Sequence, residues 1–181
     1  MPTQKTISSV ACLSGTGLHT GAEVAVELRP APARSGVVFV RTDLPGKPRV
    51  QACPENSGSK PRCTSLVRGD ANVQTVEHLM SALFATGLCN LEVHINGPEL
   101  PGMDGSALPF YEIIKETGID DQAVAAMEIG VDAPIVLTNG DSSVIAFSNP
   151  TGLRVSYTLD YNSPLLGTQY LSVLIDEDVF A

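Results

Sequence analysis

The chain has 181 residues, of which 43% are hydrophobic and 17% charged, and its formal net charge is −9 at pH 7. This length suits one or two compact domains that bury a core without disulfides or a structural metal. The composition excludes a disordered tail and a charge-rich coiled coil, and the acidic balance disfavours a nucleic-acid partner. No apolar run reaches the ~18 residues that a membrane span needs, and the amino-terminal sequence predicts no signal peptide.

The four cysteines, Cys12, Cys53, Cys63 and Cys89, are scattered and contain no CxxC pair. Scattered thiols are typical of proteins from a reducing compartment, so the sequence predicts a cytoplasmic location. A disulfide framework is the alternative, although a core of this size does not require one.

The first third of the chain predicts β-strands. Over Ala22–Arg29 valine and leucine alternate with polar or small residues, which is the period of a half-buried strand. Weaker patterns predict strands over Lys5–Leu13 and Gly36–Arg41. The glycine-rich stretch Ser14–Gly21 predicts an irregular turn, and Leu44–Arg62, which holds four prolines, predicts a long loop or a small irregular insert.

The period then changes to that of an α-helix over Thr75–Thr86, where apolar residues recur three and four positions apart. Thr75 is predicted to be its N-cap, and Gly87 stands where a left-handed glycine ends many helices. Asn90–Asn96 alternates again and predicts a strand. A second helix is predicted around Pro109–Thr117.

Beyond a weak stretch near residues 120–127 every pattern is that of a strand. Asn139-Gly140 is a strong hairpin signal between two apolar runs, and alternating strands follow over Leu153–Tyr161 and Gln169–Ile175. We therefore expect a first α+β domain over 1–122 and strands of a second over 123–181. Because no predicted helix covers these strands, the second domain is expected to be incomplete.

Glu77 and His78 are the strongest candidates for chemistry because they stand side by side in the first turn of the predicted helix. Consecutive helical positions differ by about a quarter turn, so both side chains can face one cleft. A neutral imidazole is a good zinc ligand, and a neighbouring carboxylate can take a proton from metal-bound water. The pair lacks the second histidine of HExxH, so a solvated helix face is the alternative.

The other polar motifs admit structural interpretations. His94 occupies an ordinary strand position, and His19, in the glycine-rich turn, either faces a ligand or stabilises the turn. The glycines of that turn lack GxGxxG spacing, which argues against a nucleotide fingerprint. Ser106 is not in a GxSxG elbow, and Asp104 and Ser106 are predicted to cap the second helix.

Several motifs in one order give the chain a resemblance to the zinc-dependent UDP-3-O-acyl-N-acetylglucosamine deacetylases of lipid A biosynthesis. The matching segments are GTGLHTG (Gly15–Gly21), LRPAPARSGVVF (Leu28–Phe39), RTDL (Arg41–Leu44), CTSLV (Cys63–Val67), TVEHLMSAL (Thr75–Leu83), NLEVHINGPELPGMDGSALPF (Asn90–Phe110) and LDYNSPLLGTQY (Leu159–Tyr170). The TVEHL motif together with MDGSA-x-PF is highly specific.

The resemblance implies two similar α+β domains, each a sheet covered by two helices, with the active site at their junction. It implies that Glu77 is the general base and His78 a zinc ligand, while His19 and Cys63 lie near the substrate. The implied reaction is hydrolysis of the N-acetyl group, with zinc-activated water as nucleophile and acetate and a free amine as products. The substrate is a UDP-acyl-glucosamine, and peripheral contact with this lipid-like molecule is compatible with the absence of a span.

One departure from the family stands out. Family members add a histidine and an aspartate, four residues apart, as zinc ligands from the second domain, whereas no histidine follows His94 here. Those ligands are expected beyond Ala181, and the 181 residues alone are predicted to be inactive. The alternatives are a non-catalytic protein that binds acyl-sugar nucleotides or a partner, and one half of a split enzyme. Acyl-chain length, the physiological metal and the oligomeric state stay open.

Overall fold

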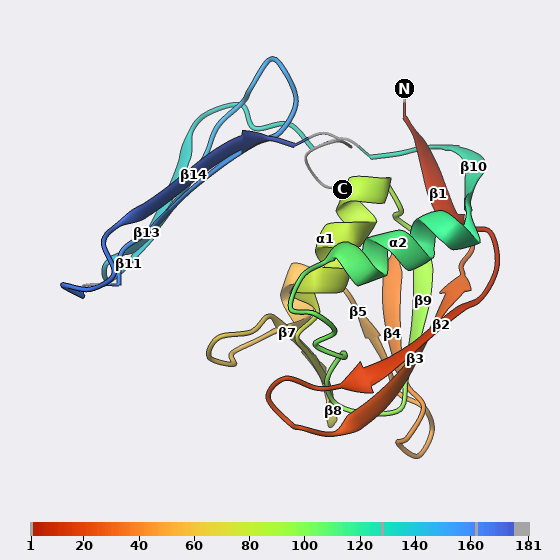
Figure 1. The fold of residues 1–181 in the computed structure, drawn as a ribbon. Helices are drawn as coiled ribbons and strands as arrows, with labels where there is room; N and C mark the ends of the chain where they lie inside the picture. Colours follow the sequence, from red (N-terminus) through yellow and green to blue (C-terminus); the bar gives the residue numbers. More distant parts are fainter. Residues whose placement is uncertain (1, 128, 162, 176–181) are drawn as a thin grey trace. The chain divides into compact units, whose positions relative to one another are not determined.

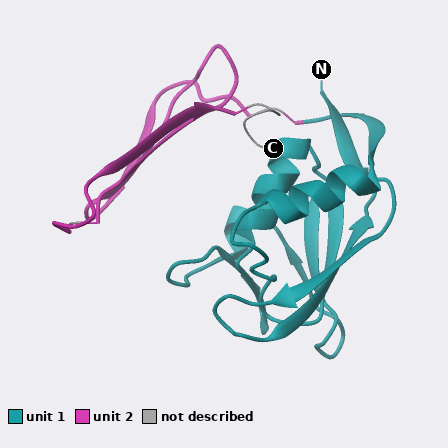
Figure 2. Cartoon of the chain, viewed as in Figure 1, with its two compact units in different colours: residues 1–126 teal, residues 127–181 magenta. Residues whose placement is uncertain are grey.

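The computed structural model describes residues 2–127, 129–161 and 163–175. The chain divides into two compact units, Met1–Ala126 (unit 1) and Met127–Ala181 (unit 2), which Figure 2 distinguishes by colour. The sequence pattern placed this division between residues 122 and 123. In the structure the last strand of unit 1 continues to Ala125, because Ala125 pairs with Thr3.

A five-stranded sheet forms the centre of unit 1. In spatial order its strands are β2 (Ala11–Thr16), β3 (Glu23–Pro30), β9 (Leu91–Ile95), β4 (Val37–Arg41) and β5 (Arg49–Gln51). Only β4 and β9 run parallel; the other neighbours are antiparallel. The alternation predicted for β3 is confirmed, because Val24, Val26 and Leu28 are buried between exposed or half-buried neighbours.

Two helices complete the core of unit 1. Helix α1 (Glu77–Thr86) and helix α2 (Leu108–Thr117) lie across one face of the five-stranded sheet (Figure 1). Leu79 and Leu83 of α1 and Phe110 and Ile114 of α2 are almost completely buried. Both predicted helices are confirmed, and Gly87, at φ 70°, ends α1 in the left-handed conformation that the sequence predicted.

Two smaller sheets complete unit 1. Strand β1 (Thr3–Ile7) pairs with β10 (Ile119–Ala125), and the second small sheet consists of β6 (Ser57–Gly58), β7 (Ser65–Arg68) and β8 (Ala71–Gln74).

The small elements overturn one prediction and decide between the two alternatives of another. Lys5–Leu13 is not one strand, because Ser8–Val10 separates β1 from β2 and each pairs in a different sheet. For Leu44–Arg62 the structure favours the irregular insert over the plain loop, since β5, β6 and a short 3₁₀ helix (Pro54–Asn56) lie within it.

The described residues of unit 2 form two antiparallel strand pairs. Strand β11 (Ile135–Asn139) pairs with β12 (Ser142–Ala146), and β13 (Arg154–Leu159) pairs with β14 (Gln169–Leu174). The hairpin predicted at Asn139-Gly140 is confirmed, with Asn139 opposite Ser142. None of the residues that the structure describes in unit 2 is buried.

The described part of the chain therefore mixes two helices with several sheets, as the α+β prediction states. The helices cover the five-stranded sheet as a second layer in unit 1. Neither of the two described helices has the length and apolar character needed to cross a membrane.

Candidate functional site

The candidate site is organised around the first turn of α1, where Glu77 is the first helical residue. Ser65 of β7 pairs with Gln74 of β8, and this register places Thr64 beside the start of the helix. The Thr64 backbone N–H donates to Glu77 Oε2 at 3.0 Å, and the Val76 N–H donates to the Thr64 carbonyl at 3.3 Å. The β7–β8 pairing thus orients the Glu77 carboxylate.

This register also locates Cys63, the residue before Thr64. Cys63, Glu77 and His78 are all half-buried. The Cys63 thiol is free, as are those of the other three cysteines. Three of the four predicted site residues therefore lie on the two segments that meet at the start of α1.

The Asp104 carboxylate, which was predicted to cap the second helix, lies near His78. Hydrogen bonds from the Ser106 backbone N–H and hydroxyl hold the pKa of Asp104 below its usual value, and the nearby His78 imidazole contributes to the lowering. The prediction that Asp104 and Ser106 cap α2 is wrong, because Ala107 occupies the N-cap position and no side chain caps the helix there. Ser106 Oγ still accepts from the Leu108 N–H at 3.1 Å, whereas the Asp104 carboxylate bonds Ser106. The sequence analysis did not predict that Asp104 lies near His78.

His19 lies in the turn between β2 and β3 and is exposed. Its backbone N–H donates to Glu99 Oε1 at 2.9 Å, and the Thr20 N–H and hydroxyl donate to Oε2 at 2.8 and 2.7 Å. The Glu99 side chain accepts these bonds in the interior, where only 1% of the residue is exposed. Sequence analysis missed Glu99, since a single glutamate after a strand carries no distinctive spacing.

Thr75 connects this carboxylate to α1. Its hydroxyl donates to Glu99 Oε1 at 2.9 Å, and its backbone adopts a φ of 59°. The prediction that Thr75 is the N-cap of α1 is wrong: Val76 occupies that position, and no side chain caps the helix there. The reason is that Thr75 Oγ1 bonds the buried carboxylate instead of the helix N–H groups.

The pKa of Glu99 results from two opposing effects. Burial by itself raises it, whereas the bonds donated by the His19 and Thr20 backbones and by the Thr20 and Thr75 hydroxyls lower it, and the net shift is downward. Glu99 is therefore ionised at neutral pH. The four predicted site residues are thus all connected to the start of α1. Cys63 precedes Thr64, which bonds Glu77, and His19 bonds Glu99, which in turn bonds Thr75.

The described residues do not form a complete metal site. No group of three or more histidine, cysteine, aspartate or glutamate side chains is placed to hold a metal ion within the part of the chain that the structure describes. Catalytic zinc usually has three protein ligands, so His78 alone does not fit the requirement. What these residues offer is an oriented carboxylate, Glu77, next to an imidazole.

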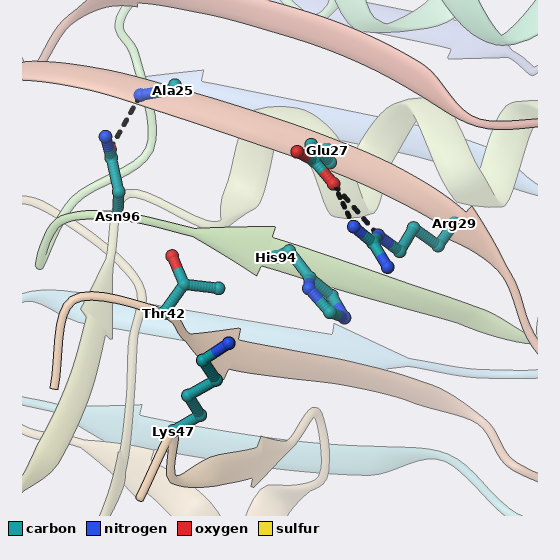
Figure 3. A pocket seen from close by; sticks show the side chains of 7 residues that line it. All are labelled: Ala25, Glu27, Arg29, Thr42, Lys47, His94 and Asn96. Atoms are coloured by element: carbon teal, nitrogen blue, oxygen red, sulfur yellow. Dashed lines mark hydrogen bonds and ion pairs between the residues drawn. The ribbon is translucent and has the colours of Figure 1, made fainter. Parts of the chain in front are cut away.

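A hollow of about 300 Å³ lies elsewhere, over the outward-facing residues of β3 and β9 (Figure 3). Glu27 and Arg29 form an ion pair there, and the Ala25 N–H donates to Asn96 Oδ1 at 2.8 Å. His94 also lines the hollow and bonds Glu92 at 3.1 Å. None of the four predicted site residues lines this hollow.

Comparison with known proteins matches residues 4–181 to the family model described as UDP-3-O-acyl N-acetylglycosamine deacetylase. Proteins named UDP-3-O-acyl-N-acetylglucosamine deacetylase from Geotalea uraniireducens and Teredinibacter turnerae are 36% and 39% identical over 100% and 96% of this chain. One from Methylococcus capsulatus is 38% identical over 90% of the chain. The aligned regions cover 59%, 57% and 53% of those relatives, so the chain spans little more than half their length.

Proposed function

Because the chain belongs to the family of UDP-3-O-acyl-N-acetylglucosamine deacetylases, we propose that it acts in removing the N-acetyl group of UDP-3-O-acyl-N-acetylglucosamine during lipid A biosynthesis. The observation that supports this most is the pair Glu77 and His78 on the first turn of α1, with the Glu77 carboxylate held by the Thr64 N–H. The proposed place of action is the cytoplasm.

Glu77 is the general base of the proposed reaction. A carboxylate has lone pairs on both oxygens, so the bond from the Thr64 N–H leaves capacity to accept a proton from water. The water oxygen bonds to the acetyl carbonyl carbon as Glu77 takes the proton. When the C–N bond breaks, the proton passes to the nitrogen that becomes the free amine, and the acetic acid that leaves ionises to acetate by losing the second proton to solvent.

His78 is the proposed zinc ligand from this chain. Because three protein ligands are usual, the remaining ligands must come from residues other than those described here, and the described residues on their own are proposed to be inactive. The strands of unit 2 are proposed to belong to a second α+β domain, and unit 1 is proposed to be the first. His19 and Cys63 are proposed to contact the substrate.

The proposal is tested by replacing Glu77 with Gln and His78 with Ala in the protein expressed from its own gene. Loss of the base is expected to lower the deacetylation rate by ~10²–10⁴, and loss of the imidazole is expected to reduce bound zinc as well. Glu112→Gln, at an exposed position on α2, is the matched control and should retain normal activity.

Two results would contradict the assignment. Near-normal activity in both variants would exclude these roles for Glu77 and His78. A wild-type protein that binds the acyl-sugar nucleotide without zinc or turnover would instead support the non-catalytic binding function.

A further inference from the structure

The Glu99 carboxylate is buried in unit 1 and receives hydrogen bonds from two separate segments. The His19 and Thr20 N–H groups and the Thr20 hydroxyl come from the turn between β2 and β3, whereas the Thr75 hydroxyl comes from the residue that precedes the N-cap of α1. These four donors surround a side chain whose residue is 1% exposed. An ionised group at such burial persists only when its lone pairs are satisfied, and here they are.

Backbone pairing holds the Glu99 segment between the same two regions. Gln74 and Glu99 form a parallel bridge, in which the Leu100 N–H donates to the Gln74 carbonyl at 3.0 Å. On the other side Gly17 bridges Pro101. The segment around Glu99 therefore lies between the end of β8 and the glycine-rich turn.

Two further features show that local structure is adapted to this carboxylate. A Cβ atom added at Gly17 would lie 2.5 Å from Glu99 Oε2 and 2.5 Å from Thr20 Oγ1, so the position has no room for a side chain. Thr75, which is β-branched, holds a φ of 59°, a conformation that is costly for such residues and persists only when surrounding contacts enforce it.

We propose that Glu99 is a positioning residue that fixes the His19 turn and the first turn of α1 relative to each other through four hydrogen-bond donors. It does not touch the substrate; it acts through His19, whose backbone it binds, and through Thr75, which leads into Glu77 and His78. The effect on catalysis rests on the function proposed above, whereas the mechanical link is a property of the fold alone.

Glutamine is the informative replacement at position 99 because it keeps the size of the side chain. Its amide supplies one acceptor oxygen and one NH₂ group, whereas the glutamate presents two acceptors. The NH₂ group would oppose a backbone N–H that has no lone pair to offer. Thr75→Val is the second variant, since it removes one donor without changing the branching at Cβ.

The experiment measures amide hydrogen exchange and deacetylation in the protein expressed from its own gene. Glu99→Gln and Thr75→Val are expected to speed exchange of the His19 and Thr20 amides by on the order of tenfold, as when one ordinary hydrogen bond is lost. They are also expected to lower kcat by roughly 10–100-fold, with a smaller change in KM, which is typical when the support of a catalytic group is removed.

Thr86→Val is the matched control. Thr86 is a buried threonine, as Thr75 is, but it lies on α1 and its hydroxyl donates to the Ala82 carbonyl at 2.8 Å within the helix. If Thr86→Val lowers the melting temperature as much as Thr75→Val does, it should still leave kcat within twofold of wild type. The exchange rates of the His19 and Thr20 amides should also stay within twofold.

The proposal is overturned if Glu99→Gln leaves the exchange of both amides unchanged, or if Thr86→Val lowers kcat as much as Thr75→Val at equal melting temperature. Absence of deacetylation in the wild-type protein would instead defeat the proposed function. In that case the exchange rates still decide whether Glu99 links the two segments.

Discussion

Units 1 and 2 both contain regular antiparallel strand pairs, but among the residues that the structure describes only those of unit 1 form a core. In unit 1 alternate residues of β3 and β9 are buried beneath two helices, and Phe39 of β4 is 0% exposed. In unit 2 the strands pair in continuous register, yet Phe147 is 66% exposed and no described residue is buried.

The difference shows that strand pairing and core formation have separate requirements. Alternating residues and a favourable turn are enough to set the register of β11 and β12 around Asn139-Gly140. Burial also requires another layer, because a sheet with bare faces removes little apolar surface from water. Three predictions test this comparison, from the largest expected effect to the smallest.

The same substitution should have very different costs in the two units. Phe39→Ala is expected to lower the free energy of unfolding of unit 1 by about 3–5 kcal/mol, because it removes a fully buried aromatic side chain. Phe147→Ala is expected to change stability by less than about 0.5 kcal/mol. Urea unfolding of the 181-residue chain, followed by the helical circular dichroism signal and by amide exchange in β12, measures both. Equal losses would mean that Phe147 is covered.

Acid should destabilise unit 1. A hydrogen bond from Arg41 lowers the pKa of Asp43, and one from Arg49 lowers the pKa of Glu92. The pKa of Glu99 is also lowered on balance, despite its burial. Groups whose pKa is lower in the folded state stabilise it above their unfolded pKa of about 4, and this contribution is lost as pH falls through the folded values.

Helical circular dichroism in urea at pH values from 7 to 3 measures this loss, because both described helices lie in unit 1. Asp43→Asn should show a shallower dependence below pH 4.5, since one of the contributing groups is gone. Equal stability at pH 7 and pH 3 would refute the prediction.

The smallest expected effect is one that both units share. Gly87, at φ 70°, and Gly140, at φ 57°, adopt the left-handed conformation, so alanine at either position should cost roughly 1 kcal/mol locally. Urea unfolding measures the cost at Gly87, and amide exchange in β11 and β12 measures it at Gly140. Gly130→Ala is the control, because Gly130 has open space around it and no positive φ. A cost at Gly87 alone would mean that core packing, not local conformation, sets the penalty.

Elements with local causes were predictable, whereas those that depend on distant partners were not. Helix α1 follows from its apolar spacing, and the β11–β12 hairpin follows from Asn139-Gly140. Strand β1 could not be separated from β2 by pattern, because its partner, β10, lies more than a hundred residues along the chain. The same holds for β5, whose partner β4 makes it a strand within a proline-rich segment.

At the candidate site the adjacency of Glu77 and His78 was visible in the sequence, because neighbouring positions in a helical pattern need no tertiary information. Their surroundings were not visible. The bond from the Thr64 N–H to Glu77 depends on the register of β7 and β8.

The sequence by itself determined the α+β class, the two helices, the strand periods and the placement of Glu77 and His78 on one helical turn, since all of these arise from spacing along the chain. Only the tertiary structure decided that Thr75 serves the Glu99 carboxylate instead of capping α1. The physical reason is that a buried charge must collect hydrogen bonds from whatever segments folding brings to it, and these lie far apart in sequence.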